Sequence, residues 1–203
     1  MTATQPTDQT PGQSTDPPWE PPLAGTDVEH LVGTLERLRA TFRWKADGLD
    51  VDQLRARAVP SSELTVGGLL KHLAVCEDDV FCWRMAGRPP VTWLSVPEEE
   101  VGRWQFTVGP EETADEVYAL WDAAVARSRE RLSALLADGG LDQPGHLDFE
   151  GERPSVRRHL HDIVEEYGRH TGHMDLLREA VDGRTGEDPP RDWPMLPAEP
   201  AAG

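Results

Sequence analysis

The segment 159–180 carries side chains that could bind a metal ion. Its sequence, HLHDIVEEYGRHTGHMDLLREA, places Glu166 and His170 four residues apart. In an α-helix this spacing puts a carboxylate and an imidazole on consecutive turns, so that both could reach one ion. His170 falls inside the apolar arc of this helix and Glu166 at its border. The same spacing also occurs in ordinary solvated pairs, so this helix alone leaves both interpretations open.

A second segment, 65–87, offers a further imidazole. His72 lies at the edge of its apolar arc, beside Cys76 and Trp83. If this edge faces the carboxylate and imidazole of the first segment, three ligands meet, and three protein ligands with one open position are typical of a catalytic zinc site. The alternative for His72 is a histidine at the edge of the core that donates to a backbone carbonyl. For Cys76 the alternative is a small buried hydrophobic residue.

Both segments belong to a set of four that have the apolar periodicity of amphipathic helices. Proline and threonine at their starts and glycine at their ends mark the boundaries, as in helix caps. The four segments are about 26–47, 65–87, 111–137 and 154–182. Glu77 falls in an apolar arc and is expected to be a hydrogen-bonded carboxylate inside the fold. Strand signals are weak, with short extended stretches indicated only at 91–96 and 103–108. The pattern therefore predicts an all-α fold, a four-helix bundle.

The two ends of the chain differ in composition from its centre. Residues 1–25 are rich in Thr, Pro, Gln and Asp without apolar periodicity, and residues 183–203 are rich in Pro and Gly. Such segments bury too little apolar surface to offset the entropy of the chain. We therefore expect disordered tails on either side of one folded domain, residues 26–182.

Charge and composition exclude several classes of function. The chain has 20 Lys+Arg and 37 Asp+Glu, a formal net charge of −17, which argues against binding to nucleic acid or to an anionic membrane. Its apolar runs are too short to span a bilayer, and its N-terminus lacks the features of a secretory signal. The two cysteines, Cys76 and Cys82, are too few for a disulfide framework. These features together predict a cytoplasmic protein.

Two longer motifs connect the chain with a known family. Residues 48–81, GLDVDQLRARAVPSSELTVGGLLKHLAVCEDDVF, combine a Gly-Leu turn, a Val-Pro-Ser segment and a helix with Leu-x-x-His-Leu-Ala. Residues 163–187, IVEEYGRHTGHMDLLREAVDGRTGE, contain Glu-Glu-Tyr-x-Arg-His-x-Gly-His. Together these motifs resemble the DinB-like superfamily, in the branch of the mini-circle proteins, over roughly residues 26–187.

The resemblance implies a four-helix bundle that holds a divalent metal through one His of the second helix and two residues of the last. By position these ligands are His72, Glu166 and His170, similar to the His/Glu/His set of the mycothiol-dependent maleylpyruvate isomerase. The implied metal is zinc, with nickel and iron as alternatives. Asp162 and His173 would be neighbouring groups that orient the ligands.

The resemblance also implies a thiol S-transferase that joins a low-molecular-weight thiol to an electrophilic small molecule. A thiol that coordinates zinc is deprotonated, so the protein itself needs no nucleophilic Cys. The 18 Arg against two Lys suggest a high-GC genome, and hence mycothiol as the thiol. We expect Trp44, Trp83 and Arg103 to line the substrate pocket.

Two alternatives remain open at this stage. The first is a metal-binding bundle without catalysis that acts in stress or binds a partner. The second is a structural dimer without metal, in which the apolar stripe of residues 154–182 is the interface. The sequence also leaves open whether an enzyme of this kind forms a homodimer.

Overall fold

The computed structural model describes residues 16–194, which form helices and connections and contain no β-strand. The elements are α1 (Asp27–Ala46), α2 (Val51–Arg55), α3 (Val66–Glu77), a π-helical segment η1 (Asp78–Met85), α4 (Glu98–Trp104), α5 (Ala114–Asp138) and α6 (Val156–Asp182). The predicted helical class is confirmed. The weak strand signals were wrong, because 91–96 forms turns and 103–104 ends α4. No helix within residues 16–194 is long and apolar enough to cross a membrane.

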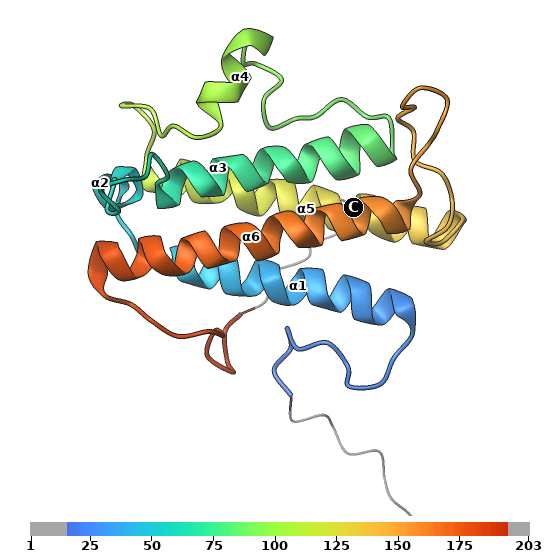
Figure 1. Ribbon diagram of the computed structural model, residues 1–203, viewed down its shortest axis with the longest axis horizontal. Coiled ribbons are helices and arrows are strands. Elements are labelled where there is room, and N and C mark those ends of the chain that lie inside the picture. The colour runs from blue at the N-terminus through green and yellow to red at the C-terminus, as the bar shows by residue number, and fades with distance from the viewer. Residues whose placement is uncertain (1–15, 195–203) are drawn as a thin grey trace, which may run out of the picture.

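The four longest helical units lie side by side along one direction (Figure 1). Helix α6 packs against α1 and α3, and α3 packs against α5, while η1 continues α3 and also contacts α5 and α6. The short helix α4 lies outside this group, in the connection that passes over α3. The segments that carry His72 and the Glu166–His170 pair are therefore neighbours.

Local capping explains where the long helices begin and end. Thr26 and Thr113 form capping boxes with Glu29 and Glu116, so each pair satisfies backbone donors that the first helical turn leaves free. Helix α6 ends at Gly183, which adopts φ 81°, a left-handed conformation that glycine enters at little cost. These observed ends agree with the boundaries expected from the sequence to within a few residues.

The second predicted helix changes its geometry after Glu77. From Asp78 onward the backbone is π-helical, so each residue turns by less than the 100° of an α-helix. Asp78 lies buried at this change and accepts hydrogen bonds from Arg127 (Nε to Oδ1, 3.0 Å) and from the Thr92 hydroxyl (2.6 Å). Side chains beyond this point are rotated away from the positions that a uniform α-helix assigns to them.

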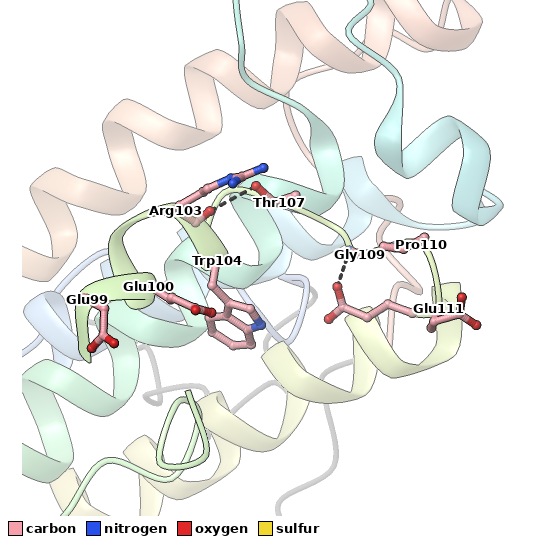
Figure 2. A pocket seen from close by; sticks show the side chains of 9 residues that line it. Glu99, Glu100, Arg103, Trp104, Thr107, Gly109, Pro110 and Glu111 are labelled. Atoms are coloured by element: carbon pink, nitrogen blue, oxygen red, sulfur yellow. Dashed lines mark hydrogen bonds between the residues drawn. The ribbon is translucent and has the colours of Figure 1, made fainter. Parts of the chain in front are cut away.

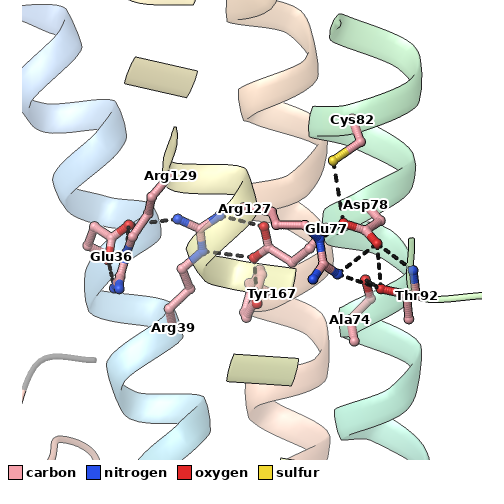
Figure 3. Close-up of polar contacts among 10 residues, drawn as sticks. All are labelled: Glu36, Arg39, Ala74, Glu77, Asp78, Cys82, Thr92, Arg127, Arg129 and Tyr167. Atoms are coloured by element: carbon pink, nitrogen blue, oxygen red, sulfur yellow. Dashed lines mark hydrogen bonds and ion pairs between the residues drawn. The ribbon is translucent and has the colours of Figure 1, made fainter. Parts of the chain in front are cut away.

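A buried ion pair crosses the centre of the fold (Figure 3). Arg39 of α1 donates from Nε and Nη2 to the two carboxylate oxygens of Glu77 on α3, at 2.8 and 2.5 Å. The hydroxyl of Tyr167 on α6 donates to Glu77 Oε1 at 2.7 Å. All three side chains are buried. The expectation that Glu77 is a hydrogen-bonded carboxylate inside the fold is thereby confirmed.

The same arginine extends the network to the fourth long helix. Arg39 Nη1 donates to Glu36 Oε1 at 2.6 Å, and Arg129 of α5 donates from Nε to Glu36 Oε2 at 3.0 Å. Burial opposes ionisation of Glu36, but the two guanidinium groups hold the pKa of this carboxyl below its usual value. One connected polar network, with charged groups on α1, α3 and α5 and the Tyr167 hydroxyl on α6, therefore joins the four long helices.

The two tails that the sequence predicts to be disordered are only partly described. Residues 1–15 of the first and 195–203 of the second lie outside the described residues. The described part of each tail contacts Arg37 of α1. In the N-terminal tail, the ring of the buried Trp19 lies under this guanidinium, with its centroid 5.8 Å away. In the C-terminal tail, Asp188 pairs with Arg37 at 2.9 Å. The domain limits at 26 and 182 stay a prediction.

We expect Glu77→Gln to lower the free energy of unfolding by about 3 kcal/mol, at the low end of the cost of breaking a buried ion pair, because Arg39 would lose its fully buried counter-charge and keep only Glu36. Urea unfolding at neutral pH measures this change. Glu63→Gln is the matched control, since Glu63 pairs with Arg57 while its side chain is 81% exposed. That variant should change the free energy by less than about 1 kcal/mol. Equal losses in the two variants would contradict the central role of the buried pair.

Candidate metal centre

Helices α3 and α6 bring three predicted ligands together. His72 Nε2 lies 3.1 Å from Glu166 Oε1, and His170 Nε2 lies 3.3 Å from the same oxygen. One ligand atom from each of the three residues lies within 4.8 Å of the others. His170 is buried, while His72 and Glu166 are partly exposed, so the cluster lies at the border between core and solvent.

The geometry of these donors fits a divalent metal ion. Two ligand atoms that each lie about 2.1 Å from a tetrahedral zinc ion are about 3.4 Å apart. The two nitrogen–oxygen separations at Glu166 Oε1, 3.1 and 3.3 Å, are close to this value. Two imidazoles and one carboxylate leave a fourth position for another ligand. The cluster could therefore hold a metal, although this donor set also accepts other first-row divalent ions.

Glu166 and His170 have the protonation states that metal binding requires. Burial opposes ionisation of Glu166, but the hydrogen bond with His72 and the proximity of His170 hold the pKa of this carboxyl below its usual value. Burial, together with the nearby His72, lowers the pKa of His170. At neutral pH the carboxylate is therefore ionised and the His170 imidazole is neutral, which are the metal-binding forms.

Gln105 and Phe106 hold the His72 ring from the side of α4. The Nδ1 atom of His72 lies 2.8 Å from Gln105 Oε1. An amide oxygen only accepts hydrogen bonds, so this contact places a proton on Nδ1, while Nε2 faces Glu166 and would give its lone pair to a bound metal ion. The Phe106 ring stacks on the His72 ring with centroids 4.5 Å apart. Neither residue was expected at the site, because no local sequence pattern links the 105–106 connection with α3.

The two groups expected to orient the ligands have different surroundings. His173 Nδ1 lies 3.2 Å from His170 Nδ1, the ring nitrogen that points away from Glu166. Asp162 instead accepts a hydrogen bond from Arg158 Nε at 2.9 Å. The structure thus brings His173 to the cluster and pairs Asp162 with an exposed arginine.

The residues expected to line a substrate pocket are not gathered at the cluster. The Trp83 ring packs against His146, with centroids 5.8 Å apart, because the π-helical backbone of η1 rotates it away from the face of His72. Trp44 is buried beneath Arg184, whose guanidinium lies 4.9 Å from its ring centroid. Arg103 is exposed on α4. Of the three residues, only Arg103 lies near the contacts with His72 in the chain, since it precedes Gln105 by two residues.

A hollow of about 740 Å³ follows α4 and the connection after it (Figure 2). Trp104 forms part of its wall, and Lys71 Nζ lies 4.1 Å from the centroid of this ring. Lys71 also donates to Glu112 Oε1 at 2.9 Å. The residues lining the hollow are Glu99, Glu100, Arg103, Trp104, Thr107, Gly109, Pro110, Glu111 and Glu112. The α4 connection thus lines this hollow through Trp104 and Thr107, and the same connection holds His72 through Gln105 and Phe106.

A comparison with known protein families finds a match. A family model described as Mycothiol-S-transferase matches residues 30–183. The matched range contains His72, Glu166 and His170, and it includes α3 and α6 in full. A comparison with curated proteins finds no match.

The two thiols of the chain are held in the protonated form. Cys76 Sγ lies 3.6 Å from His72 Nε2, and Cys82 Sγ donates to Asp78 Oδ1 at 3.4 Å. Burial, with the negative charge of Glu166, raises the pKa of Cys76 far above its usual value. Burial, with the negative charge of Asp78, raises the pKa of Cys82 to about 11. Neither side chain has the low thiol pKa of a nucleophilic cysteine.

We expect iodoacetamide to modify Cys76 and Cys82 slowly in the folded, chelator-treated protein at pH 8. With a pKa of about 11, only about one Cys82 side chain in a thousand is a thiolate at that pH, and the fraction rises about tenfold per pH unit. Peptide mass spectrometry against time measures both rates, and urea-unfolded protein is the control. Alkylation as fast in the folded as in the unfolded chain would contradict the burial of these thiols.

Proposed function

The chain belongs to the mycothiol-S-transferase family, and we propose that it joins mycothiol to an electrophilic small molecule with the aid of a zinc ion. The proposed ligands are His72, Glu166 and His170. The observation that carries the proposal is the convergence of these three donor atoms within 4.8 Å of one another in a chain of this family.

We also propose that the four long helical units form a four-helix bundle of the DinB type. Their packing order supports this, since α6 contacts both α1 and α3, and α3 contacts α5. In such bundles, side chains on facing helices build metal sites. His72 from α3 and the Glu166–His170 pair from α6 have this arrangement.

The chain's own residues prepare and shield the site. Gln105 holds the Nδ1 proton of His72, so that Nε2 is free to bind the metal. The stacked Phe106 ring restricts rotation of the same imidazole and covers one of its faces. When bound, the zinc ion would lower the pKa of a coordinating thiol enough to give a thiolate at neutral pH.

The cysteines of the chain support an external thiol as the nucleophile. Cys76 lies beside His72, but burial and the Glu166 charge raise its thiol pKa, which favours the unreactive protonated form. In the proposed transfer, the sulfur of the small thiol loses its proton and bonds to the electrophilic carbon. The leaving group departs with the electron pair of the bond that breaks.

We expect His72→Ala to lose both zinc binding and thiol transfer, because one of three ligands is removed while the core keeps its packing. Elemental mass spectrometry on tag-free protein measures the zinc content. Transfer is measured as release of chloride and formation of the S-conjugate from mycothiol and 1-chloro-2,4-dinitrobenzene. The control is His161→Ala, which removes an exposed histidine of α6 and should change neither quantity.

The outcomes separate the proposed function from its alternatives. About one zinc per chain with S-conjugate formation, both lost in His72→Ala, supports a metal-dependent transferase. Zinc binding without conjugate formation from any thiol and electrophile pair tested would instead indicate a metal-binding bundle without catalysis. Full transfer activity in His72→Ala would overturn the proposed site.

We expect Gln105→Ala to weaken zinc binding by about 10–100-fold, because the hydrogen bond that sets the tautomer of His72 is lost. Gln105→Glu should restore most of the affinity, since its carboxylate also accepts the Nδ1 proton. Competition with a chromophoric chelator gives the affinities, and nitrogen chemical shifts of the His72 ring report the tautomer. Equal affinities in wild type and Gln105→Ala, with an unchanged tautomer, would contradict this role.

A further inference from the structure

A second hollow, of about 440 Å³, lies at the start of α6. Arg84 of η1, the connection 149–154 and the first turns of α6 line it. His159 is the α6 residue set deepest in its wall. It precedes Glu166 by seven residues, which is about 10 Å along the helix axis, so this hollow is separate from the proposed zinc ligands.

His159 is buried without a hydrogen-bond partner. Its side chain is 2% exposed, and neither Nδ1 nor Nε2 has a partner among the described residues. The backbone of Gly145 packs closely against one side of the His159 ring. A side chain at Gly145 would crowd the ring, since its Cβ atom would lie 3.1 Å from Nε2. Burial and the nearby Arg84 charge lower the pKa of His159, so the ring is neutral and carries one N–H donor. A buried imidazole normally finds a partner, because an unpaired polar group costs free energy.

Arg84 adds a second unpaired donor to the same hollow. Its Nη2 forms an ion pair with Asp79 Oδ2 at 2.6 Å. Its Nε is buried and has no partner within residues 16–194. Two unpaired nitrogen groups, one on an arginine and one on a histidine, thus line one cavity. An oxygen acceptor that enters the hollow could satisfy both.

Each arginine that lines the hollow already lies near a carboxylate. Arg153 Nε lies 3.7 Å from Asp148, and the ion pairs of Arg84 and Arg158 measure 2.6 and 2.8 Å. Net charge therefore does not select the ligand. The two unfilled N–H donors do, because a buried donor requires an oxygen acceptor.

The rim of the hollow is partly apolar. Phe149 lines it and is 47% exposed, which gives a flat apolar surface next to the arginines. A ligand with an oxyanion group and a small apolar part would match both features, since guanidinium groups bind carboxylates and phosphates by charge-assisted hydrogen bonds.

We propose that this hollow is a second binding site, which takes the oxyanion group of a small organic molecule on His159 and Arg84, with Arg153 at its rim. The shared chemistry is that of a carboxylate or a phosphate group. The site is independent of the zinc cluster and stands whether or not the proposed transferase activity is confirmed.

The first test is a titration of the full chain, labelled with ¹⁵N at its histidines, with benzoate and separately with inorganic phosphate at constant ionic strength. We expect a saturable shift of the His159 ring nitrogens with at least one of the two anions. His161, exposed on the same helix, is the internal control and should show no saturable shift. Saturation with benzoate alone identifies a carboxylate with an apolar part, and saturation with phosphate identifies a phosphate group.

The second test compares variants by calorimetric titration with the anion that binds. Arg153→Gln should weaken binding about tenfold, because a charge-assisted hydrogen bond to the anion is removed. Arg57→Gln is the matched control, since Arg57 is also exposed and pairs with Glu63 away from the hollow. His159→Leu should abolish binding and, without anion, raise the unfolding temperature, because an unpaired buried group is replaced by an apolar one.

Absence of a saturable shift with both anions at high millimolar concentration would overturn the proposal, and so would equal weakening in Arg153→Gln and Arg57→Gln. If His159→Leu does not fold, the comparison of the two arginine variants still decides the question. The zinc content of Arg153→Gln is measured as a control. It should equal that of the wild type, which would show that the substitution does not affect the metal site.

Discussion

The buried ion pair between Arg39 and Glu77 is the constraint on which the arrangement of the helices depends. A guanidinium in the core is tolerable only beside its counter-charge, so α1 and α3 must meet at this level. The Tyr167 hydroxyl donates to the same carboxylate and thereby sets the position of α6 along α3. Tyr167 is the neighbour of Glu166, and Glu77 follows His72 on α3. A shift of α6 by one turn would unpair the hydroxyl and separate the cluster residues.

Long helices and a connecting segment contribute different groups to the cluster. Two long helices supply the ligand atoms, held in place by core packing and by the central ion pair. The connection that contains α4 supplies Gln105 and Phe106, which orient one imidazole and cover it. The ligand atoms therefore belong to the long helices, while the groups that orient His72 belong to a connection that also lines a separate hollow.

Helix α6 contributes to both sites of the molecule. His170 and Glu166 lie in its middle, and His159 lies two turns nearer its start, in a hollow closed by η1 and the connection before α6. The π-helical segment η1 follows α3, which carries His72, and itself carries Arg84 of the second hollow. It buries Asp78 and places Trp83 against His146, beside Arg84 of the second hollow. The change from α-helical to π-helical backbone thus falls between His72 and Arg84 along the chain.

The amino-acid sequence by itself determined the long helices, their ends, the shared face of Glu166 and His170, and the polar role of Glu77. Periodicity and capping depend on bonds within one helix, so they can be read locally. Only the tertiary structure decided that His72 faces the Glu166–His170 pair, that Gln105 fixes its tautomer, and that His159 is buried unpaired. These contacts join segments far apart in the chain, and their distances depend on packing and on the path of the connections. Helical periodicity placed Trp83 beside His72 because it assumes α-helical geometry throughout, whereas the backbone is π-helical from Asp78 and the Trp83 ring packs against His146.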